Sequence, residues 1–358
     1  MLDPRSPIKG RGATGRPANR FDQIAYVRDL DADYGEDPRP DTQYLPDASK
    51  SIISTNDSPD IPFEASLNPY RGCEHGCVYC YARPTHEYLG FSSGLDFETR
   101  IMVKHEAPAL LREALASPRW TPKVLSMCGV TDAYQPVERR LRLTRQCLEV
   151  LAEFRNPVGI VTKNALVMRD IDILSDLAAH NAAMVMLSVT TLDVPLNRVL
   201  EPRTSLPRQR LEAIARLADA GIPVGVMVAP VIPGLNDEEI PAILREAAAA
   251  GARHASFTML RLPHAVAPLF EAWLEAHYPD RKDRILNRVR SVRDGRLNDG
   301  QFGSRMRGEG FHADQIASLF RVSCRKFGFN EQDLDLSTES FRRPERGGQM
   351  SLFDTPPG

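Results

Sequence analysis

Short apolar runs alternate with amphipathic stretches along the middle of the chain. The runs are rich in β-prone residues and predict strands at Glu64–Leu67, Lys123–Met127, Val158–Thr162, Met184–Thr190, Pro223–Ala229 and His254–Met259. Helical spacing of apolar residues predicts helices at Ala107–Ala116, Glu138–Phe154, Arg169–His180, Leu206–Ala220, Asp237–Ala250 and Val266–His277. This alternation predicts an α/β protein with a parallel sheet, either doubly wound or an open partial barrel. In both architectures the functional residues lie at the carboxyl ends of the strands.

The two ends of the chain lack this periodicity. Residues 1–20 carry five Lys or Arg against one acid, and residues 22–41 reverse the sign with seven acids. We therefore expect a flexible N-terminal arm at residues 1–60, a core at 61–278, a basic helical extension at 279–336 and a flexible tail at 337–358. The apolar runs are shorter than the roughly 18 residues of a membrane helix. The first residues have no apolar signal core, so we expect a cytoplasmic protein without a membrane partner.

The composition of the 358-residue chain is that of an ordinary globular protein, with a formal net charge of −2 and six cysteines. Six cysteines are too few for a disulfide scaffold in a chain of this length. Three of them form the motif Cys73-x3-Cys77-x2-Cys80, directly after the first predicted strand. Three thiolates can hold an iron–sulfur cluster and leave one iron open to a small molecule. The alternative is a zinc site in which His75 or His86 supplies the fourth ligand.

The cysteine motif, placed after the first strand of a six-unit chain, resembles that of the radical S-adenosylmethionine (radical SAM) superfamily. The resemblance covers roughly residues 60–275 and implies a partial (β/α)6 barrel. It also implies a 4Fe-4S cluster that binds S-adenosylmethionine (SAM) and cleaves it reductively to a 5′-deoxyadenosyl radical. Tyr79, just before the third cysteine, matches the aromatic position that packs on the adenine; its alternative role is that of a core aromatic.

The same resemblance gives cofactor-binding roles to residues at the later strand ends, namely Gly129, Thr131, Asp132, Lys163, Ser188, Thr190, Arg203 and Asn236. The first three stand where the superfamily has a Gly-Gly-Glu-like run that binds the amino group of methionine. The two cationic side chains suit carboxylate or phosphate groups. The two hydroxyls suit the ribose, and Asn236 lies in the expected adenine-side turn. Helix capping by Asp132 and Asn236, and a surface ion pair at Arg203, are the structural alternatives.

One stretch is similar to the spore photoproduct lyase branch of the superfamily. Cys128 precedes Thr131-Asp132, and Thr162-Lys163 follows at the next strand end. In that branch a cysteine near such a pair returns a hydrogen atom to a thymine radical. The similarity therefore implies a catalytic role for Cys128, whereas a buried and inert thiol is the structural alternative.

The region after the predicted core points to nucleic acid. Residues 280–326 carry twelve Lys or Arg against six acids. Such a basic region could bind a DNA backbone. A solvent-exposed helix face would show the same excess of basic residues. In the tail, Gln349-Met-Ser-Leu-Phe353 resembles the pentapeptide with which bacterial DNA proteins dock on the replication sliding clamp. DNA and the sliding clamp are therefore expected partners.

Together these features predict a radical SAM enzyme that acts on damaged DNA or another nucleic acid. Its reductant would be a protein such as flavodoxin or ferredoxin. Two alternatives remain open: a radical SAM enzyme acting on a peptide or small metabolite, and a zinc-stabilised nucleic-acid adaptor without catalysis.

Overall fold

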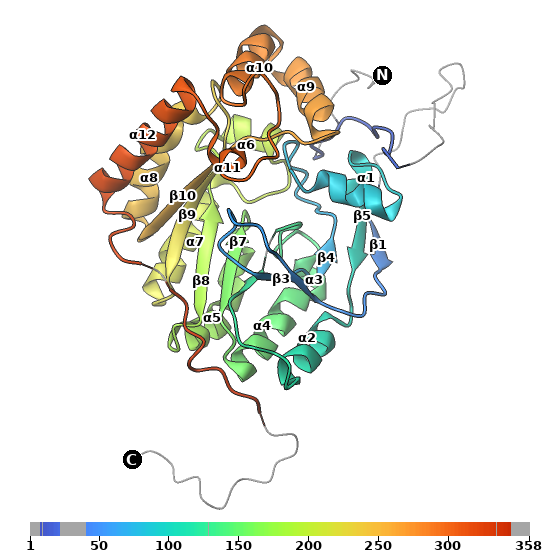
Figure 1. Ribbon diagram of the computed structural model, residues 1–358, viewed down its shortest axis with the longest axis vertical. Helices are drawn as coiled ribbons and strands as arrows, with labels where there is room; N and C mark the ends of the chain where they lie inside the picture. The colour runs from blue at the N-terminus through green and yellow to red at the C-terminus, as the bar shows by residue number, and fades with distance from the viewer. Residues whose placement is uncertain (1–7, 9, 22–40, 128, 334, 345–358) are drawn as a thin grey trace, which may run out of the picture.

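A seven-stranded sheet forms the centre of the molecule in the computed structural model, which describes residues 8, 10–21, 41–127, 129–333 and 335–344 (Figure 1). The strands, in chain order, are β2 (Ile53–Thr55), β3 (Ala65–Leu67), β6 (Leu125–Met127), β7 (Val158–Thr162), β8 (Ala183–Ser188), β9 (Val224–Val231) and β10 (His254–Met259). Their order in the sheet is β10-β9-β8-β7-β6-β3-β2. The strands β3, β6, β7, β8, β9 and β10 pair in parallel along this order, and β2 pairs antiparallel with β3.

The order of the parallel strands decides between the two architectures. A doubly wound sheet reverses its strand order at a switch point, whereas here each new strand is added at the same edge. Right-handed crossovers then keep the connecting helices on one face of the sheet, as in an open partial barrel. The sequence prediction of an α/β protein with these six strands is confirmed.

The sequence did not predict the short helix at Val194–Leu200, and the other helices between the strands begin and end close to the predicted positions. The helices between the strands are α2 (Ala107–Ala116), α3 (Glu138–Leu141), α4 (Leu143–Phe154), η2 (Ala165–Asp170), α5 (Ile171–Ala178), α6 (Val194–Leu200), α7 (Pro207–Asp219), η3 (Asp237–Glu239) and α8 (Ile240–Ala249). The helix expected at Glu138–Phe154 is divided at Arg142, which has a φ of 54°. The division lets the buried Glu138 carboxylate accept the backbone N–H of Thr144 at 3.1 Å.

A second, three-stranded sheet lies beside the cysteine motif. Its strands are β1 (Gln43–Pro46), β5 (Arg100–Val103) and β4 (Tyr70–Arg71), in the order β1-β5-β4. β4, η1 (Arg83–Leu89), α1 (Leu95–Thr99) and β5 are inserted between β3 and α2, whereas β1 precedes β3 in the chain. Part of the N-terminal arm expected at residues 1–60 therefore belongs to sheets, because β1 and β2 both lie in it.

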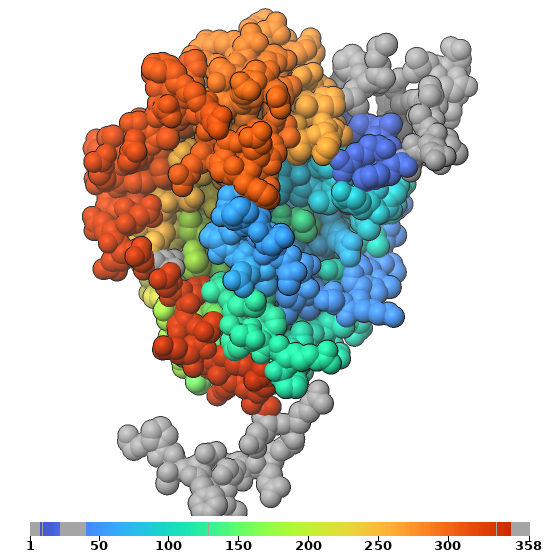
Figure 2. Space-filling model, in the orientation of Figure 1, coloured from blue at the N-terminus to red at the C-terminus, as the bar shows by residue number. Residues whose placement is uncertain are grey.

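The region after β10 is helical, as expected. It contains α9 (Val266–His277), η4 (Pro279–Arg281), α10 (Lys282–Ser291), α11 (Ser304–Arg307) and α12 (Phe311–Phe327), and α12 packs against α8. The apolar stripe of α10 is buried, since Ile285 and Val289 have no exposed surface. In Figure 2 this distal region meets the residues around β2 across the front of the molecule.

The first residues of the expected tail lie along the core. Phe341 packs against Phe154 with a ring-centroid distance of 6.3 Å, and the backbone N–H of Ser337 donates to Asn181. Gln349–Phe353 lies outside the described residues. Among the helices that the structure describes, none combines the length and apolar character needed to cross a membrane.

Candidate active site at the cysteine loop

The cysteine loop, residues 72–82, connects β4 to η1 at the carboxyl end of β3. Cys73 and Cys77 are buried, and Cys80 is half-buried. Gly72 and Gly76 have φ values of 79° and 69°, a conformation that residues with a side chain rarely adopt. These two glycines turn the chain so that the loop folds back on itself, and the N–H of Cys80 donates to the carbonyl of Cys77 at 3.2 Å.

The three thiols lie close enough together to interact electrostatically. Burial raises the pKa of Cys77 well above its usual value, and the neighbouring Glu201, Cys80 and Cys73 add to this rise. Burial also raises the pKa of Cys80. A bound cation that stabilises thiolates would overcome this cost, as metal centres do for cysteine ligands. The donor set therefore fits an iron–sulfur cluster held by three cysteines.

The alternative of a zinc site finds no support among the described residues. Zinc needs its ligands within about 2.0–2.3 Å of one atom. Within the described residues, no group of three or more His, Cys, Asp or Glu side chains is close enough to hold one metal ion. The two histidines proposed as a fourth zinc ligand have other partners. His75 pairs with Asp132 at 3.3 Å, and His86 Nε2 lies 2.9 Å from the carbonyl of Arg100.

Asp132 ties the cysteine loop to the end of β7. Its carboxylate accepts the hydroxyl of Thr162 at 2.7 Å and the backbone N–H of Lys163 at 2.8 Å. Burial disfavours a charged His75, but Asp132 and Cys73 outweigh it and raise the pKa of His75 to about 10. Burial likewise opposes ionisation of Asp132, yet His75 and the two donors lower the pKa of Asp132 to about 2. The ion pair thus joins residues 57 positions apart as one rigid corner of the site.

A buried carboxylate, Glu201, forms the second corner. The hydroxyl of Tyr79 donates to it, Thr190 donates at 2.6 Å, and the guanidinium of Arg210 pairs with it from α7. The Nζ atom of Lys163 lies 3.8 Å from the same carboxylate. Burial would raise the pKa of Glu201, but Arg210 and Lys163 outweigh it and lower that pKa to about 2. Glu201 therefore stays negative and fixes the positive groups around it.

Tyr79 and Lys163 meet at this corner. The Nζ atom of Lys163 stands 5.9 Å from the centroid of the Tyr79 ring and donates to the carbonyl of Ala229 at 3.1 Å. The ring expected to pack on adenine is thus buried between the cysteine loop and Glu201. Sequence reasoning did not predict a role for Glu201, although it lies two residues before Arg203. The sequence feature that could have identified Glu201 is an acidic residue directly after a short helix, and this feature alone is weak evidence for a site residue.

Arg203 and Asn236 have protein partners in the structure. Arg203 pairs with the buried Glu74 at 3.1 Å while its side chain is 30% exposed. The side-chain amide of Asn236 donates to the carbonyls of Thr190 and Pro230, at 2.8 and 3.0 Å. Asn236 therefore braces the turn after β9, and its side chain does not cap the following helix.

The residues after β6 lie beside the loop. The carbonyl of Gly129 accepts the hydroxyl of Tyr81 at 2.6 Å, and Thr131 is buried. Ser188 is buried at the end of β8, where its carbonyl accepts a hydrogen bond from the guanidinium of Arg210 at 2.8 Å. Cys128 lies outside the described residues. The predicted positions at the ends of β6, β7, β8 and β9 thus come together around the cysteine loop.

Two further residues that sequence reasoning missed hold the loop backbone. Gln135 accepts the N–H of Glu74 at 2.9 Å and donates to the carbonyl of Gly72 at 3.2 Å. The Glu74 carboxylate accepts the N–H of Val137 at 2.7 Å. Both side chains are fully buried, and only the tertiary structure shows that they face each other.

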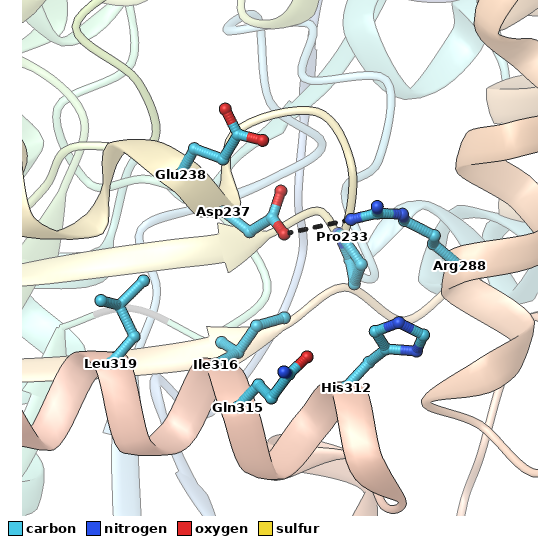
Figure 3. A pocket seen from close by; sticks show the side chains of 8 residues that line it. All are labelled: Pro233, Asp237, Glu238, Arg288, His312, Gln315, Ile316 and Leu319. Atoms are coloured by element: carbon cyan, nitrogen blue, oxygen red, sulfur yellow. Dashed lines mark ion pairs between the residues drawn. The ribbon is translucent and has the colours of Figure 1, made fainter.

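A hollow away from these residues lies between the turn after β9, α10 and α12 (Figure 3). It is lined by Pro233, Asp237, Glu238, Arg288, His312, Gln315, Ile316 and Leu319. Arg288 and Asp237 approach to 3.9 Å across it. None of the predicted site residues lines this hollow, so it is separate from the candidate active site.

Comparison with known proteins agrees with the geometry of the loop. A family model described as the radical SAM superfamily matches residues 67–247, which include the three cysteines and the ends of β3, β6, β7, β8 and β9. The chain belongs to the radical SAM superfamily. Members of this superfamily are enzymes of radical reactions, and membership implies an iron–sulfur cluster and SAM.

Several relatives of this radical SAM protein are uncharacterised. The protein Rv2578c of Mycobacterium tuberculosis is 38% identical over 222 residues, which are 62% of this chain and 65% of that protein. The protein MJ0683 of Methanocaldococcus jannaschii is 28% identical over 223 residues, which are 62% of this chain and 80% of that protein. The match thus spans somewhat less than two thirds of the length of the mycobacterial relative.

Solved structures share the fold. A spore photoproduct lyase variant has a TM-score of 0.56 at 18% identity, with 80% of each chain covered. Spore photoproduct lyase complexed with dinucleoside spore photoproduct has a TM-score of 0.55 at 17% identity, again with 80% of each chain covered. At these identities the similarity concerns the fold of the radical SAM core.

Proposed function

We propose that this protein binds a 4Fe-4S cluster through Cys73, Cys77 and Cys80 and acts with SAM on a nucleic acid. When bound, the cluster and SAM would supply a 5′-deoxyadenosyl radical that abstracts a hydrogen atom from the substrate. The observation that carries the proposal is the buried three-cysteine loop at the carboxyl edge of the parallel sheet, braced by Asp132 and Glu201.

The other residues of the site bind and orient. Lys163 lies near the ring of Tyr79 and Arg203 pairs with Glu74, so both cations are close to the loop, and their charges would suit the carboxylate of SAM. Gly129, Thr131 and Asp132 would border its amino group. Ser188 and Thr190 would be on the side of its ribose, and Asn236 on that of its adenine. Thr190 and Asn236 would act by holding the carbonyls of Ala229 and Thr190 in place, since their side chains already have these protein partners.

The nucleic-acid class rests on four side chains next to the loop, which we call the aromatic–arginine lip: Tyr81, Arg261, Phe302 and Arg305. Tyr81 is 46% exposed and Phe302 is 61% exposed. The Arg261 guanidinium lies 4.5 Å from the Tyr81 ring centroid, and that of Arg305 lies 4.7 Å from the Phe302 ring centroid. Arg261 interacts electrostatically with Cys80 and Arg305, so the lip borders the cluster site.

Exposed rings beside arginines are the usual means of holding unstacked bases and their phosphates. A lesion in a duplex would have to leave the base stack to reach the loop. Spore photoproduct lyase, whose fold this chain shares, has been solved with a dinucleoside photoproduct. That similarity supports DNA as the substrate and leaves Cys128 as the candidate hydrogen-atom donor.

Anaerobic reconstitution tests the proposed chemistry. Iron, sulfide and 5′-deoxyadenosine are measured with SAM and either a chemical reductant or flavodoxin. We expect about four irons and four sulfides per chain, and deoxyadenosine that disappears in Cys77→Ala. Cys324→Ala is the matched control, because that thiol lies on α12 outside the loop. Zinc without sulfide, and no deoxyadenosine, would support the adaptor alternative instead.

A further inference from the structure

Residues 10–21 run along the outer side of the cysteine loop and α1, and we call this segment the strap. The carbonyl of Gly15 accepts the N–H of Leu95 at 3.0 Å, and the carbonyl of Pro17 accepts the hydroxyl of Ser92 at 2.9 Å. Arg16 pairs with Asp96 at 2.7 Å, and Asn19 donates to the carbonyl of Glu87 at 2.9 Å. The strap is therefore held along its length, although its sequence shows no strand or helix pattern.

The strap reaches the cluster ligands through two buried charges. Glu98 accepts the backbone N–H groups of Gly12 and Ala13, at 3.1 and 2.8 Å. The same carboxylate pairs with Arg83, and Arg83 donates through Nε to the carbonyl of Cys77 at 3.0 Å. The side chains of Glu98 and Arg83 are both 0% exposed. A continuous chain of charge-assisted hydrogen bonds thus links the strap backbone to a cluster cysteine.

Backbone also meets backbone at the same place. A Cβ atom on Gly12 would stand 1.7 Å from the carbonyl oxygen of Gly76 and 3.0 Å from the nitrogen of Val78. No real Cβ atom makes the first contact, so any other residue at position 12 must push the strap off the loop. The restriction comes from this contact, because the φ of Gly12 is outside the positive range.

The strap also excludes solvent from the ligand side of the loop. Ala13 is 1% exposed and packs in one apolar cluster with Cys77, Val78, Tyr79 and Leu95. Displacing the strap would open this cluster to water and to dissolved oxygen. Cys77 would then lose the cover that keeps it 8% exposed.

We propose that the strap is a positioning element that fixes the cysteine loop in its cluster-binding shape and shields the bound cluster from solvent. The shielding part rests on the cluster assignment under the proposed function. The positioning part concerns contacts that exist without the cluster. Gly12 and Glu98 act through Arg83 and the loop backbone, and neither residue is a ligand.

Two substitutions release the strap without touching a cysteine. Gly12→Ala pushes against Gly76, and Gly94→Ala pushes against Gly15, since its Cβ would stand 2.1 Å from that carbonyl oxygen. Gly300→Ala is the matched control, because a Cβ there meets nothing within 4 Å. Circular dichroism checks that each variant folds, and Gly94→Ala carries the test if Gly12→Ala does not fold.

The first readout uses metal-free protein and trypsin, with cleavage after Arg11 and Arg20 followed by mass spectrometry. We expect cleavage in both strap variants to be faster by about tenfold, because proteolysis follows the open population. The control should be cleaved at the wild-type rate. Unchanged cleavage in both strap variants would overturn the positioning role.

The second readout uses reconstituted protein, with iron and sulfide content, the electron paramagnetic resonance signal of the reduced cluster, and the rate of bleaching in air. We expect the strap variants to bleach several-fold faster and to show an altered signal. Faster proteolysis with wild-type bleaching and signal would overturn the shielding role alone. A wild-type protein without iron and sulfide would refute the cluster assignment, a result distinct from both.

Discussion

The hydroxyl of Tyr79 donates a hydrogen bond to the carboxylate of Glu201, a residue 122 positions later in the chain. This contact joins the cysteine loop to the segment between α6 and α7, and both side chains are buried. Arg210 pairs with the same carboxylate and balances its charge. The position of the cysteine loop therefore depends on the ion pair between Glu201 and Arg210, which lies outside the loop.

Removal of the Glu201 charge should destabilise the fold. Glu201→Gln leaves the fully buried guanidinium of Arg210 without its counter-charge, and we expect a loss of about 3 kcal/mol in the free energy of unfolding. Chemical denaturation of the metal-free protein measures this loss. Glu246→Gln is the control, because its pair with Arg245 is exposed and should cost no more than about 0.5 kcal/mol. Equal losses would contradict the structural role of Glu201.

The same carboxyl predicts how stability depends on pH. Its pKa is 4.5 in the ordinary state and about 2 in the folded protein. A carboxyl with a lowered folded-state pKa contributes stability that is complete above 4.5 and is lost as the pH falls towards 2. The unfolding free energy of metal-free protein should therefore decline through this window. The decline in unfolding free energy should be smaller in Glu201→Gln. Identical pH profiles for this variant and the wild type would contradict the lowered pKa of Glu201.

Lys163 provides a test of SAM binding that is separate from the cluster. Lys163→Met removes the ammonium that lies beside Tyr79 and Glu201, and we expect the KM for SAM to rise by about tenfold with unchanged iron content. Lys163→Arg keeps the charge and should retain most of the affinity. If Lys163→Met and wild type gave the same KM, the carboxylate of SAM would not lie at Lys163.

The aromatic–arginine lip predicts binding of single-stranded DNA. Tyr81→Ala and Phe302→Ala should each weaken binding by about tenfold, because each removes one stacking surface. Phe311→Ala is the control, since its ring is 71% exposed but lies outside the lip. Arg261→Ala should also reduce the slope of log affinity against log salt by about one. Fluorescence anisotropy measures the affinity of each variant for single-stranded DNA. Unaltered affinities would show that the lip does not bind the substrate.

The tail predicts a protein partner. If Gln349–Phe353 docks on the sliding clamp, the double substitution Leu352→Ala/Phe353→Ala should abolish clamp binding by the intact protein. Surface plasmon resonance against purified clamp measures this loss. The control Thr355→Ala lies just after the pentapeptide and should bind normally. Equal binding by all forms, or binding by none, would contradict the motif.

The sequence predicted most strands of the central sheet because they are short runs of β-prone apolar residues, and β6, β8 and β9 are largely buried. Val158–Thr162 and His254–Met259 match the predicted strands at both ends. The small sheet was missed because its strands are two to four residues long, and β1 pairs with β5 across 57 positions, from Gln43 to Arg100. Such pairing leaves no local period to detect.

The residues of the candidate site likewise fall into those that local sequence predicts and those that depend on contacts between distant segments. The cysteine loop follows from spacing and from two glycines, which are local features. The partners of Glu201 and Glu98 depend on which segments meet in space. The strap illustrates the difference, because Gly12 looks like any glycine in a polar stretch until Gly76 is placed against it.

The ion pair between Asp60 and Arg305 has a consequence for access to the sheet. Asp60 lies between β2 and β3 at one edge of the seven-stranded sheet, and Arg305 lies in α11, which contacts β10 at the other edge. The two edges are thus joined at this point by side chains, with no ladder of backbone hydrogen bonds between β2 and β10. If a nucleic acid binds here as proposed, its phosphates would compete with Asp60 for the guanidinium of Arg305. Loss of this ion pair would then separate the two edges without breaking any pairing between β-strands of the sheet.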